Sequence, residues 1–361
     1  MVSGKEAEDI KYMKLALRLS REGLGYTEPN PLVGAVVVKD NQVISTGYHR
    51  RFGDDHAERT ALKDVYKTDT TLYVTLEPCI HFGKTPPCVD LLKEKKVKRV
   101  VIAMKDPNPV INGKGIAWCK ENGMAVKVGV LAGSAEKINR HYLKYITQKR
   151  PYVALKAGIS IDGKLTDKFF KSQWITDLEL RDVAHNLRGE FSAILVGANT
   201  VRSDDPLLTI RDKKWPEKKL YRVVLDTQNT LDSEFKIFSD REQFPLILFS
   251  SKKDKNRLAR ADTHFFVSQD DDDKLNLMEI LGKLFQLGIA SVLVEGGGDM
   301  INSFLKNNIV DEIILFQASK LIGGQQSIEL FSSGVGLSTP LVLKEKEVIE
   351  LKNGLIIRGF M

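Results

Sequence analysis

Short apolar segments of strand length alternate with segments of helical periodicity along most of this 361-residue chain. In the first half the pattern predicts a helix around residues 10–19, a hairpin over 34–47 that turns at Asp40 and Asn41, and then helix 57–66, strand 72–76, helix 90–96, strand 98–103, helix 114–122, strand 125–129 and helix 134–147. The second half predicts strands near 152–157, 192–197, 221–225, 245–249 and 290–295, with helices near 177–188, 273–287 and 298–306. Such alternation indicates an α/β layer fold around a largely parallel sheet.

A domain boundary is predicted where the last helix of the first half meets Pro151. Proline ends helices, and basic residues such as Lys149 and Arg150 are typical of a last helical turn. The sequence therefore predicts two domains, 1–150 and 151–361.

The two predicted domains differ in charge. Residues 1–150 hold 26 basic and 17 acidic side chains, a net charge of +9, whereas 151–361 has a net charge of −2. A basic excess is compatible with nucleic acid, an anionic membrane surface or a small phosphorylated ligand.

Cysteine content and hydropathy limit the class of protein. Three cysteines are too few for a disulfide scaffold. The first ten residues lack the apolar core of a signal peptide, and no apolar run approaches the roughly 18 residues that suggest a membrane span. We therefore expect a cytoplasmic protein with no membrane partner.

A candidate metal site is formed by His56, Cys79 and Cys88. One imidazole and two thiolates supply three ligands for tetrahedral zinc and leave the fourth position to water, as catalytic zinc requires. Zinc lowers the pKa of such a water towards ~7. Glu58 follows the histidine by two residues, next to the metal rather than on it, where it can shuttle protons. The order His-x-Glu then Pro-Cys is typical of zinc deaminases.

Other readings of these residues stay open. A closed structural zinc site needs a fourth ligand, for which His81 and Cys119 are candidates, and iron can occupy a similar site. In a non-catalytic protein module the metal would only hold the cysteine-containing loop in place. Eight residues separate the two cysteine ligands, where many zinc deaminases have two, so this insert must loop out. We expect its polar side chains, His81 and Lys84 among them, to line a substrate pocket.

Four segments of the first half resemble the bifunctional riboflavin-biosynthesis deaminase-reductase family: 27–34 (TEPNPLVG), 56–58 (HAE), 74–88 (VTLEPCIHFGKTPPC) and 106–115 (DPNPVINGKG). In that family the long loop between the cysteines distinguishes the pyrimidine deaminase domain from cytidine and tRNA-adenosine deaminases. The resemblance implies a cytidine-deaminase-like three-layer α/β domain that binds one Zn²⁺. Asn30 is then a further candidate for substrate contact.

The second half has glycine-rich and polar turns but no G-x-G-x-x-G fingerprint. Residues 158–165 match a phosphate-binding loop until the last place, where Leu165 replaces the required hydroxyl, so we reject that reading. Three glycines, 296–298, follow a strand and precede a helix, a turn at which a backbone can approach phosphates. Arg188 and Arg211 are candidates for holding a ligand phosphate.

Segments 155–163, 172–176, 196–211 and 292–299 resemble, in order, the reductase domain of the same family. That domain is similar in fold to dihydrofolate reductase, which accounts for the missing fingerprint. The resemblance implies NADPH as cofactor, contacted by Ala157, Trp174, Thr200, Asp204, Gly297 and Gly298. It implies substrate contacts from Ser172, Arg188, Leu207, Arg211 and Glu295.

Two sites on one chain fit two consecutive steps. The expected first step is zinc-dependent hydrolytic deamination of 2,5-diamino-6-ribosylamino-4(3H)-pyrimidinone 5′-phosphate. The second is NADPH-dependent reduction of the ribosyl group to the ribityl form. A rival reading is a tRNA-type deaminase whose basic first half binds RNA and which is fused to an unrelated reductase-like domain. The long cysteine loop favours the small phosphorylated substrate, so we expect no nucleic-acid partner and a homo-oligomeric enzyme.

Overall fold

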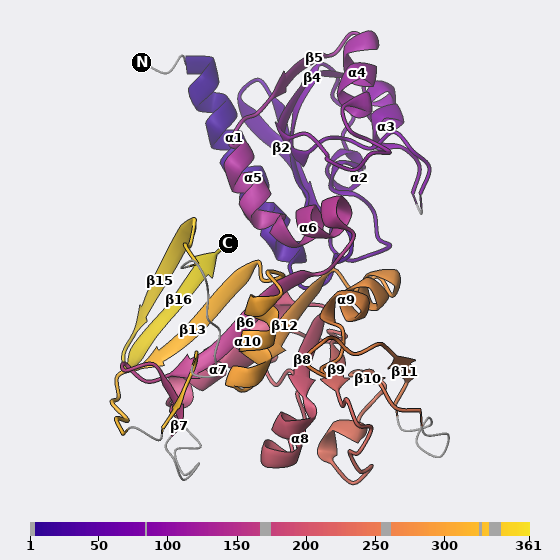
Figure 1. The fold of residues 1–361 in the computed structure, drawn as a ribbon. Helices are drawn as coiled ribbons and strands as arrows, with labels where there is room; N and C mark the ends of the chain where they lie inside the picture. Colours follow the sequence, from indigo (N-terminus) through magenta and orange to yellow (C-terminus); the bar gives the residue numbers. More distant parts are fainter. Residues whose placement is uncertain (1–3, 84, 167–174, 254–260, 325–326, 332–340) are drawn as a thin grey trace. The chain divides into compact units, whose positions relative to one another are not determined.

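A computed structural model describes residues 4–83, 85–166, 175–253, 261–324, 327–331 and 341–361 (Figure 1). The chain divides into two compact units, Met1–Lys149 and Arg150–Met361, next to the expected boundary. In the part of the chain that the structure describes, no helix has the length and apolar character needed to cross a membrane.

The first unit is built on a five-stranded mixed sheet in the order β2-β1-β3-β4-β5. Strand β1 pairs antiparallel with both β2 and β3, whereas β3, β4 and β5 run parallel, so the expectation of a largely parallel sheet is only partly met here. Its elements are α1 (Gly4–Ser20), η1 (Arg21–Gly23), β1 (Gly34–Lys39), β2 (Gln42–Tyr48), α2 (Ala57–Leu62), β3 (Thr70–Leu76), α3 (Cys88–Glu94), β4 (Val97–Met104), α4 (Lys114–Glu121), β5 (Ala125–Val128), α5 (Ala132–Ile138) and α6 (Arg140–Gln148).

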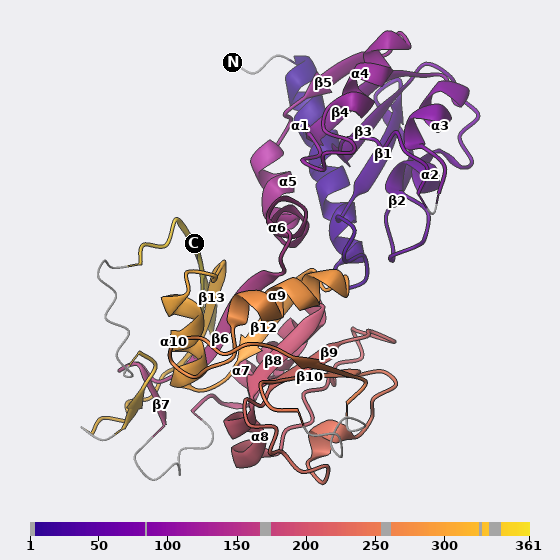
Figure 2. The same ribbon diagram turned by 45° about the vertical axis from the view of Figure 1, so that its right-hand side comes forward.

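The predicted hairpin is confirmed, because β1 and β2 pair around Asp40 and Asn41 with positive φ values of 48° and 58°. Asparagine and aspartate tolerate that conformation, which matches the twist of the strands. Helices α1 and α5 lie on one side of the sheet, and α2 and α3 lie on the other (Figures 1 and 2). Strands β1, β3 and β4 are therefore buried on both faces, which explains their nearly continuous apolar sequences.

The helix predicted over 134–147 is wrong in one respect, because the chain forms two helices, α5 and α6, that meet at Asn139. The buried side chain of Asn139 accepts a hydrogen bond from the amide of Leu32 (2.7 Å) and donates one to the carbonyl of Leu32 (3.0 Å). The side chain at the break between α5 and α6 therefore holds the backbone of Leu32, which is far away along the chain. The contact fixes the stretch of chain that follows Asn30.

Helix α1 is tied to the sheet by a buried carboxylate. Asp9 accepts a bidentate hydrogen bond from Arg99 (2.7 and 2.8 Å) and further bonds from Lys127 (2.9 Å) and the Tyr73 hydroxyl (3.0 Å). Burial alone would raise the pKa of Asp9, but the hydrogen bonds from Arg99 and Lys127 lower it to about 2. Asp9 therefore stabilises the fold in its charged form.

The stability that Asp9 contributes should disappear in acid. Its folded pKa of about 2 lies below the ordinary value of about 3.9, so the contribution is complete above pH ~4 and is lost as the pH falls towards ~2. We expect Asp9→Asn to lower the free energy of unfolding at neutral pH by on the order of 2 kcal/mol and to flatten its pH dependence in that window. Urea unfolding at several pH values measures both effects, with the exposed Asp64→Asn as control. Equal acid sensitivity of Asp9→Asn and wild type would contradict this assignment.

The second unit is built on a nine-stranded sheet in the order β11-β10-β9-β8-β12-β6-β13-β16-β15. The seven strands from β11 to β13 run parallel, which agrees with the expected largely parallel sheet although only five of them were predicted as strands, and β16 and β15 add an antiparallel edge. The elements are β6 (Tyr152–Ile159), β7 (Lys164–Thr166), α7 (Leu178–Leu187), η2 (Arg188–Glu190), β8 (Ala193–Gly197), α8 (Ala198–Asp204), β9 (Tyr221–Leu225), η3 (Lys236–Phe238), β10 (Leu246–Ser250), β11 (Thr263–Phe266), α9 (Leu277–Gln286), β12 (Ser291–Glu295), α10 (Gly298–Lys306), β13 (Glu312–Ala318), β14 (Ile328–Glu329), β15 (Glu345–Leu351) and β16 (Gly354–Phe360).

Successive residues of the central strands enter different cores. Val153 and Leu155 of β6 pack with α9 and α10, whereas Tyr152 and Ala154 pack with α7. The sheet is thus covered on both faces and positions the carboxyl ends of several parallel strands side by side. Ligands of open α/β sheets bind at such ends. Lys164 and Leu165 lie in the short strand β7 rather than at the start of a helix, so the rejection of a phosphate-binding loop is confirmed.

Sequence reasoning missed seven helices and strands among the described residues of this unit: β7, α8, β11, β13, β14, β15 and β16. Helix α8 buries only Val201, so it has little apolar periodicity. Strand β15 lies at the edge of the sheet and is largely exposed, which leaves a charged sequence without the alternation of a half-buried strand. The helix predicted over 273–287 begins later, where the Asn276 side chain accepts a hydrogen bond from the amide of Glu279.

Candidate functional site

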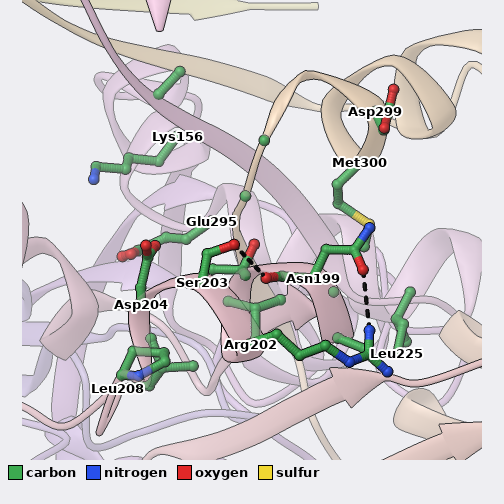
Figure 3. A pocket seen from close by; sticks show the side chains of 18 of the residues that line it. Lys156, Asn199, Arg202, Ser203, Asp204, Leu208, Leu225, Glu295, Asp299 and Met300 are labelled. Atoms are coloured by element: carbon green, nitrogen blue, oxygen red, sulfur yellow. Dashed lines mark hydrogen bonds between the residues drawn. The ribbon is translucent and has the colours of Figure 1, made fainter. Parts of the chain in front are cut away.

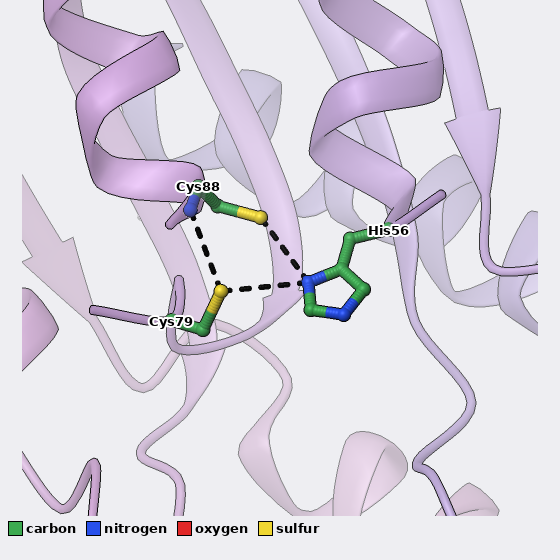
Figure 4. A group of neighbouring side chains, drawn as sticks. All are labelled: His56, Cys79 and Cys88. Carbon is green, nitrogen blue, oxygen red and sulfur yellow. Dashed lines mark hydrogen bonds between the residues drawn. The ribbon is translucent and has the colours of Figure 1, made fainter. Parts of the chain in front are cut away.

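The three predicted metal ligands meet in the first unit although they come from three places in the sequence. His56 immediately precedes α2, Cys79 follows β3, and Cys88 is the first residue of α3. Their ligand atoms lie within 4.8 Å of one another. The His56 Nδ1 atom lies 3.4 Å from Sγ of Cys79 and 3.3 Å from Sγ of Cys88 (Figure 4). One nitrogen and two sulfurs in this arrangement form an open three-ligand set that suits a tetrahedral Zn²⁺.

The two thiols share a hydrogen bond, and Cys79 is the partner that favours the thiolate form. A hydrogen bond from Cys88, with a further one from His56, lowers the pKa of Cys79 to about 4. The amide of Cys88 also donates to the Cys79 sulfur (3.4 Å). The pKa of Cys88 is instead raised, because its thiol donates to the neighbouring sulfur and is buried. Two adjacent buried thiolates repel each other, and a divalent cation between them removes that penalty.

Glu58 lies in the first turn of α2 and is 4% exposed. Burial, and then the charge of Cys79, raise its pKa to about 7. A carboxyl group poised near neutral pH can both accept and return a proton, which is the requirement for a general acid–base group. A bound cation would shift its pKa downward by direct attraction.

A second histidine supports this site, and sequence reasoning did not single it out. His49 is buried, and its ring packs edge-on against that of His56 with centroids 5.6 Å apart. Its Nδ1 lies 3.0 Å from the carbonyl of Asp55, and its Nε2 lies 3.2 Å from the side-chain nitrogen of Asn30. Burial lowers the pKa of His49, so a neutral ring donates to Asp55 and accepts from Asn30. This bond orients the amide of Asn30, one of the predicted substrate contacts.

Glu77, two residues before the first cysteine ligand, has a structural role. Its buried carboxylate accepts hydrogen bonds from the amides of Asp106 (3.2 Å), Gly113 (2.9 Å) and Ile116 (3.1 Å). Asp106 in turn accepts a bond from the Tyr142 hydroxyl (2.8 Å). The loop between β4 and α4 is thereby fixed beside the cysteine loop. A carboxylate preceding Pro-Cys was visible in the sequence, but its partners were not.

The remaining predictions for the first unit have mixed outcomes. Cys119 lies in the main hydrophobic core and His81 is exposed, and neither belongs to the ligand group found among the described residues. The fourth ligand that a closed structural site needs is therefore missing from that group. His81 is on the surface of the cysteine loop, and Lys84 lies outside the described residues.

The second unit contains a cavity of about 1440 Å³ at the carboxyl ends of its parallel strands. Every predicted reductase residue that the structure describes lines this cavity, namely Ala157, Arg188, Thr200, Asp204, Leu207, Arg211, Glu295, Gly297 and Gly298. The other two predictions, Ser172 and Trp174, lie outside the described residues. Asp226 and Thr227, which follow β9, line the cavity as well and were missed, although the end of a parallel strand is itself a signal.

Charged groups are paired inside this cavity. Arg188 donates to both carboxylate oxygens of Glu295 (3.1 and 3.0 Å) and to the carbonyl of Thr209 (3.0 Å). Burial raises the pKa of Glu295, but the charges of Arg188 and Lys156 prevail and lower it to about 2. Lys156, which lies close enough to Glu295 for its charge to act on that carboxylate, is a further lining residue that sequence reasoning missed (Figure 3).

The two arginines proposed as phosphate ligands therefore differ. The guanidinium of Arg188 is largely committed to Glu295 and Thr209, so it orders the cavity wall. Arg211 is exposed at the cavity rim and has no ion-pair partner within the described ranges, which leaves its charge available to an anionic ligand.

Comparison with known proteins gives matches to both units. Residues 6–104 match the cytidine and deoxycytidylate deaminase zinc-binding region, and residues 151–357 match the RibD C-terminal domain. The riboflavin biosynthesis protein RibD of Aquifex aeolicus is 41% identical over 354 residues, which cover 97% of this chain and 97% of that protein. The RibD of Bacillus amyloliquefaciens is also 41% identical, over 89% of this chain and 87% of its own.

A solved structure extends the likeness to the fold. The diaminohydroxyphosphoribosylaminopyrimidine deaminase/5-amino-6-(5-phosphoribosylamino)uracil reductase of Thermotoga maritima is 37% identical, with a TM-score of 0.88 and 99% of each chain covered. The match to a zinc-binding region agrees with the ligand set of His56, Cys79 and Cys88.

Proposed function

Because this chain belongs to the RibD family of riboflavin biosynthesis proteins, in which a zinc-binding deaminase region precedes a reductase domain, we propose that it catalyses two consecutive steps on one phosphorylated pyrimidine. We assign hydrolytic deamination to residues 1–150 and reduction to residues 151–361. The proposed substrate is 2,5-diamino-6-ribosylamino-4(3H)-pyrimidinone 5′-phosphate. The name of the Thermotoga maritima relative, a deaminase and reductase of such compounds, supports this choice.

In the deaminase, His56, Cys79 and Cys88 would hold the zinc ion. When bound, zinc supplies a water activated for attack on the amino-bearing carbon. Glu58 accepts the proton of that water and delivers it to the departing amino group, so that one water is consumed and one ammonia is released. Asn30, whose side-chain amide contacts His49, would donate or accept a hydrogen bond on the pyrimidine. The convergence of the three ligands next to buried Glu58 is the observation that carries this proposal.

In the reductase, we propose NADPH as the cofactor, and when bound it supplies the hydride. Gly297 is the N-cap of α10 and Gly298 is its first residue, and both line the cavity. A β-carbon built on Gly297 would have no atom within 4 Å apart from those of the residues next to it in the chain. The backbone there is open to a phosphate group. Thr200 and Asp204 would complete the cofactor site, and Leu207 and Arg211 would hold the ribose phosphate. Glu295, fixed by Arg188, positions the substrate against the cofactor.

This assignment is tested by measuring the two reactions separately. The purified chain should release ammonia from the diaminopyrimidinone phosphate, and a chelator should abolish that release. NADPH oxidation should require the deaminated product and should persist with chelator. Ammonia release that survives complete removal of metal would contradict the first half of the proposal, and NADPH oxidation that does not depend on the deaminated product would contradict the second.

The tRNA-type alternative makes a different prediction. A nucleic-acid deaminase would bind tRNA at functional concentrations and lose that binding steeply with added salt. The alternative also joined the deaminase to an unrelated domain, whereas residues 151–357 match the RibD C-terminal domain. The small phosphorylated pyrimidine therefore remains the substrate that we propose.

A further inference from the structure

A fully buried charged side chain of the second unit, Arg222, lies in strand β9. It is 0% exposed and is one of the largest fully buried side chains among the described residues. Among the described residues, its guanidinium donates to backbone carbonyls alone: Nε to Phe244 (2.9 Å), Nη1 to Leu207 (3.1 Å), and Nη2 to Ser239 (2.7 Å) and Asp240 (3.3 Å). Arg222 therefore joins Leu207 and the segment 239–244 to strand β9 of the sheet.

A buried arginine without a carboxylate partner is energetically unfavourable. Burial lowers the pKa of Arg222 to about 10, so the side chain stays charged at neutral pH. The charges of Asp240 and Asp262 oppose that shift, yet neither forms an ion pair with Arg222 among the described residues. An apolar residue of similar volume would avoid the desolvation penalty. The guanidinium therefore has a structural role that an apolar side chain could not perform, because it donates hydrogen bonds to four backbone carbonyl groups.

One of these carbonyls belongs to the cavity wall. Asp204, Asp205, Pro206, Leu207 and Leu208 all line the cavity, and the chain adopts positive φ at Asp205 (40°) and at Leu208 (52°). Positive φ is unfavourable for a branched, non-glycine residue and persists only where the surroundings enforce it. The Leu208 side chain is anchored in an apolar cluster, and Arg222 holds the carbonyl of the preceding residue.

We propose that Arg222 is a positioning residue of the reductase, which acts by fixing the carbonyl of Leu207 and thereby the wall segment 204–208 that carries proposed cofactor and substrate contacts. This inference rests on the proposed reductase function. Arg222 itself does not line the cavity. Its effect on the reaction therefore passes through the placement of Asp204 and Leu207.

A second arginine of this unit, which is largely buried, supplies a matched control. Arg358, in β16, is ion-paired with Glu312 and Glu190 and does not line the cavity. Removing either guanidinium should destabilise the second unit. Only removal of Arg222 should displace the wall segment.

The test compares Arg222→Met and Arg222→Lys with Arg358→Met in the full-length protein. For each variant, reductase KM and kcat are measured with the deaminated product, and deaminase activity is measured as an internal control. Arg222→Met is expected to raise the reductase KM by about tenfold or more with a smaller change in kcat, because misplaced contacts weaken binding. Arg222→Lys, which retains the charge but not the fork of donors, should fall between Arg222→Met and wild type. Deaminase activity should stay unchanged throughout.

Hydrogen exchange provides a readout that does not depend on turnover. Amides of segment 204–211 should exchange faster in Arg222→Lys than in wild type, whereas those of β6 and β12 should not. An unchanged KM and unchanged exchange in Arg222→Lys would overturn the inference even if Arg222→Met fails to fold. An equal rise in KM for Arg358→Met would also overturn it, because the effect would then be general destabilisation. A wild-type chain without reductase activity would instead contradict the proposed function.

Discussion

Glu58→Gln is expected to lower the kcat of deamination by about 10²–10⁴-fold, the range typical of a lost general acid–base group. Glutamine keeps the size of the side chain and its capacity for hydrogen bonds but cannot carry the proton. Glu58 is buried next to the three ligands without belonging to them, so the zinc content should remain near that of wild type. Ammonia release and metal content, measured on the same preparation, check both expectations.

The controls separate chemistry from folding. The reductase rate of Glu58→Gln should equal that of wild type, because the described residues that line the reductase cavity all belong to the second unit. Glu94→Gln, an exposed glutamate in α3, should leave both activities unchanged. A Glu58→Gln protein that binds zinc and still deaminates at the wild-type rate would refute the proton-transfer role.

Cys88→Ala is expected to reduce bound zinc to a small fraction of the wild-type content and to abolish deamination. Only two ligands would remain, His56 and Cys79, and two protein ligands do not make up the three that a catalytic zinc site requires. Metal analysis of dialysed protein and the ammonia assay measure the two effects. NADPH oxidation with the deaminated product should persist, as it should in wild type treated with a chelator.

Cys119, the third cysteine, provides a matched control for Cys88→Ala. Cys119→Ala removes an equally buried thiol that lies in the main core and outside the ligand group. It should retain zinc and deaminase activity while losing some stability, since it leaves only a small cavity. Equal zinc loss in both variants would show that cysteine burial, rather than ligation, controls metal content.

The metal site could be predicted almost completely from the sequence. The chain contains six histidines and three cysteines, so residue type alone does not select the site; the order His-x-Glu followed by two Pro-Cys steps singles out His56, Glu58, Cys79 and Cys88. The support around them could not be predicted. His49 and Glu77 are ordinary residue types whose roles depend on partners such as Asn30 and Gly113, which are far away along the chain.

In the second unit, the sequence determined the α/β class and five of the seven parallel strands, because buried strands must be apolar and must be joined by helices. It did not determine the exposed edge strand β15 or the polar helix α8, where burial imposes little pattern. The arginines show the same limit. The sequence does not distinguish the environments of three arginines. Only the tertiary structure shows that Arg188 is paired with Glu295, that Arg211 is exposed at the cavity, and that Arg222 is buried against four backbone carbonyls. Residue chemistry is local and is written in the sequence, whereas a side chain's role is set by the groups that folding places around it.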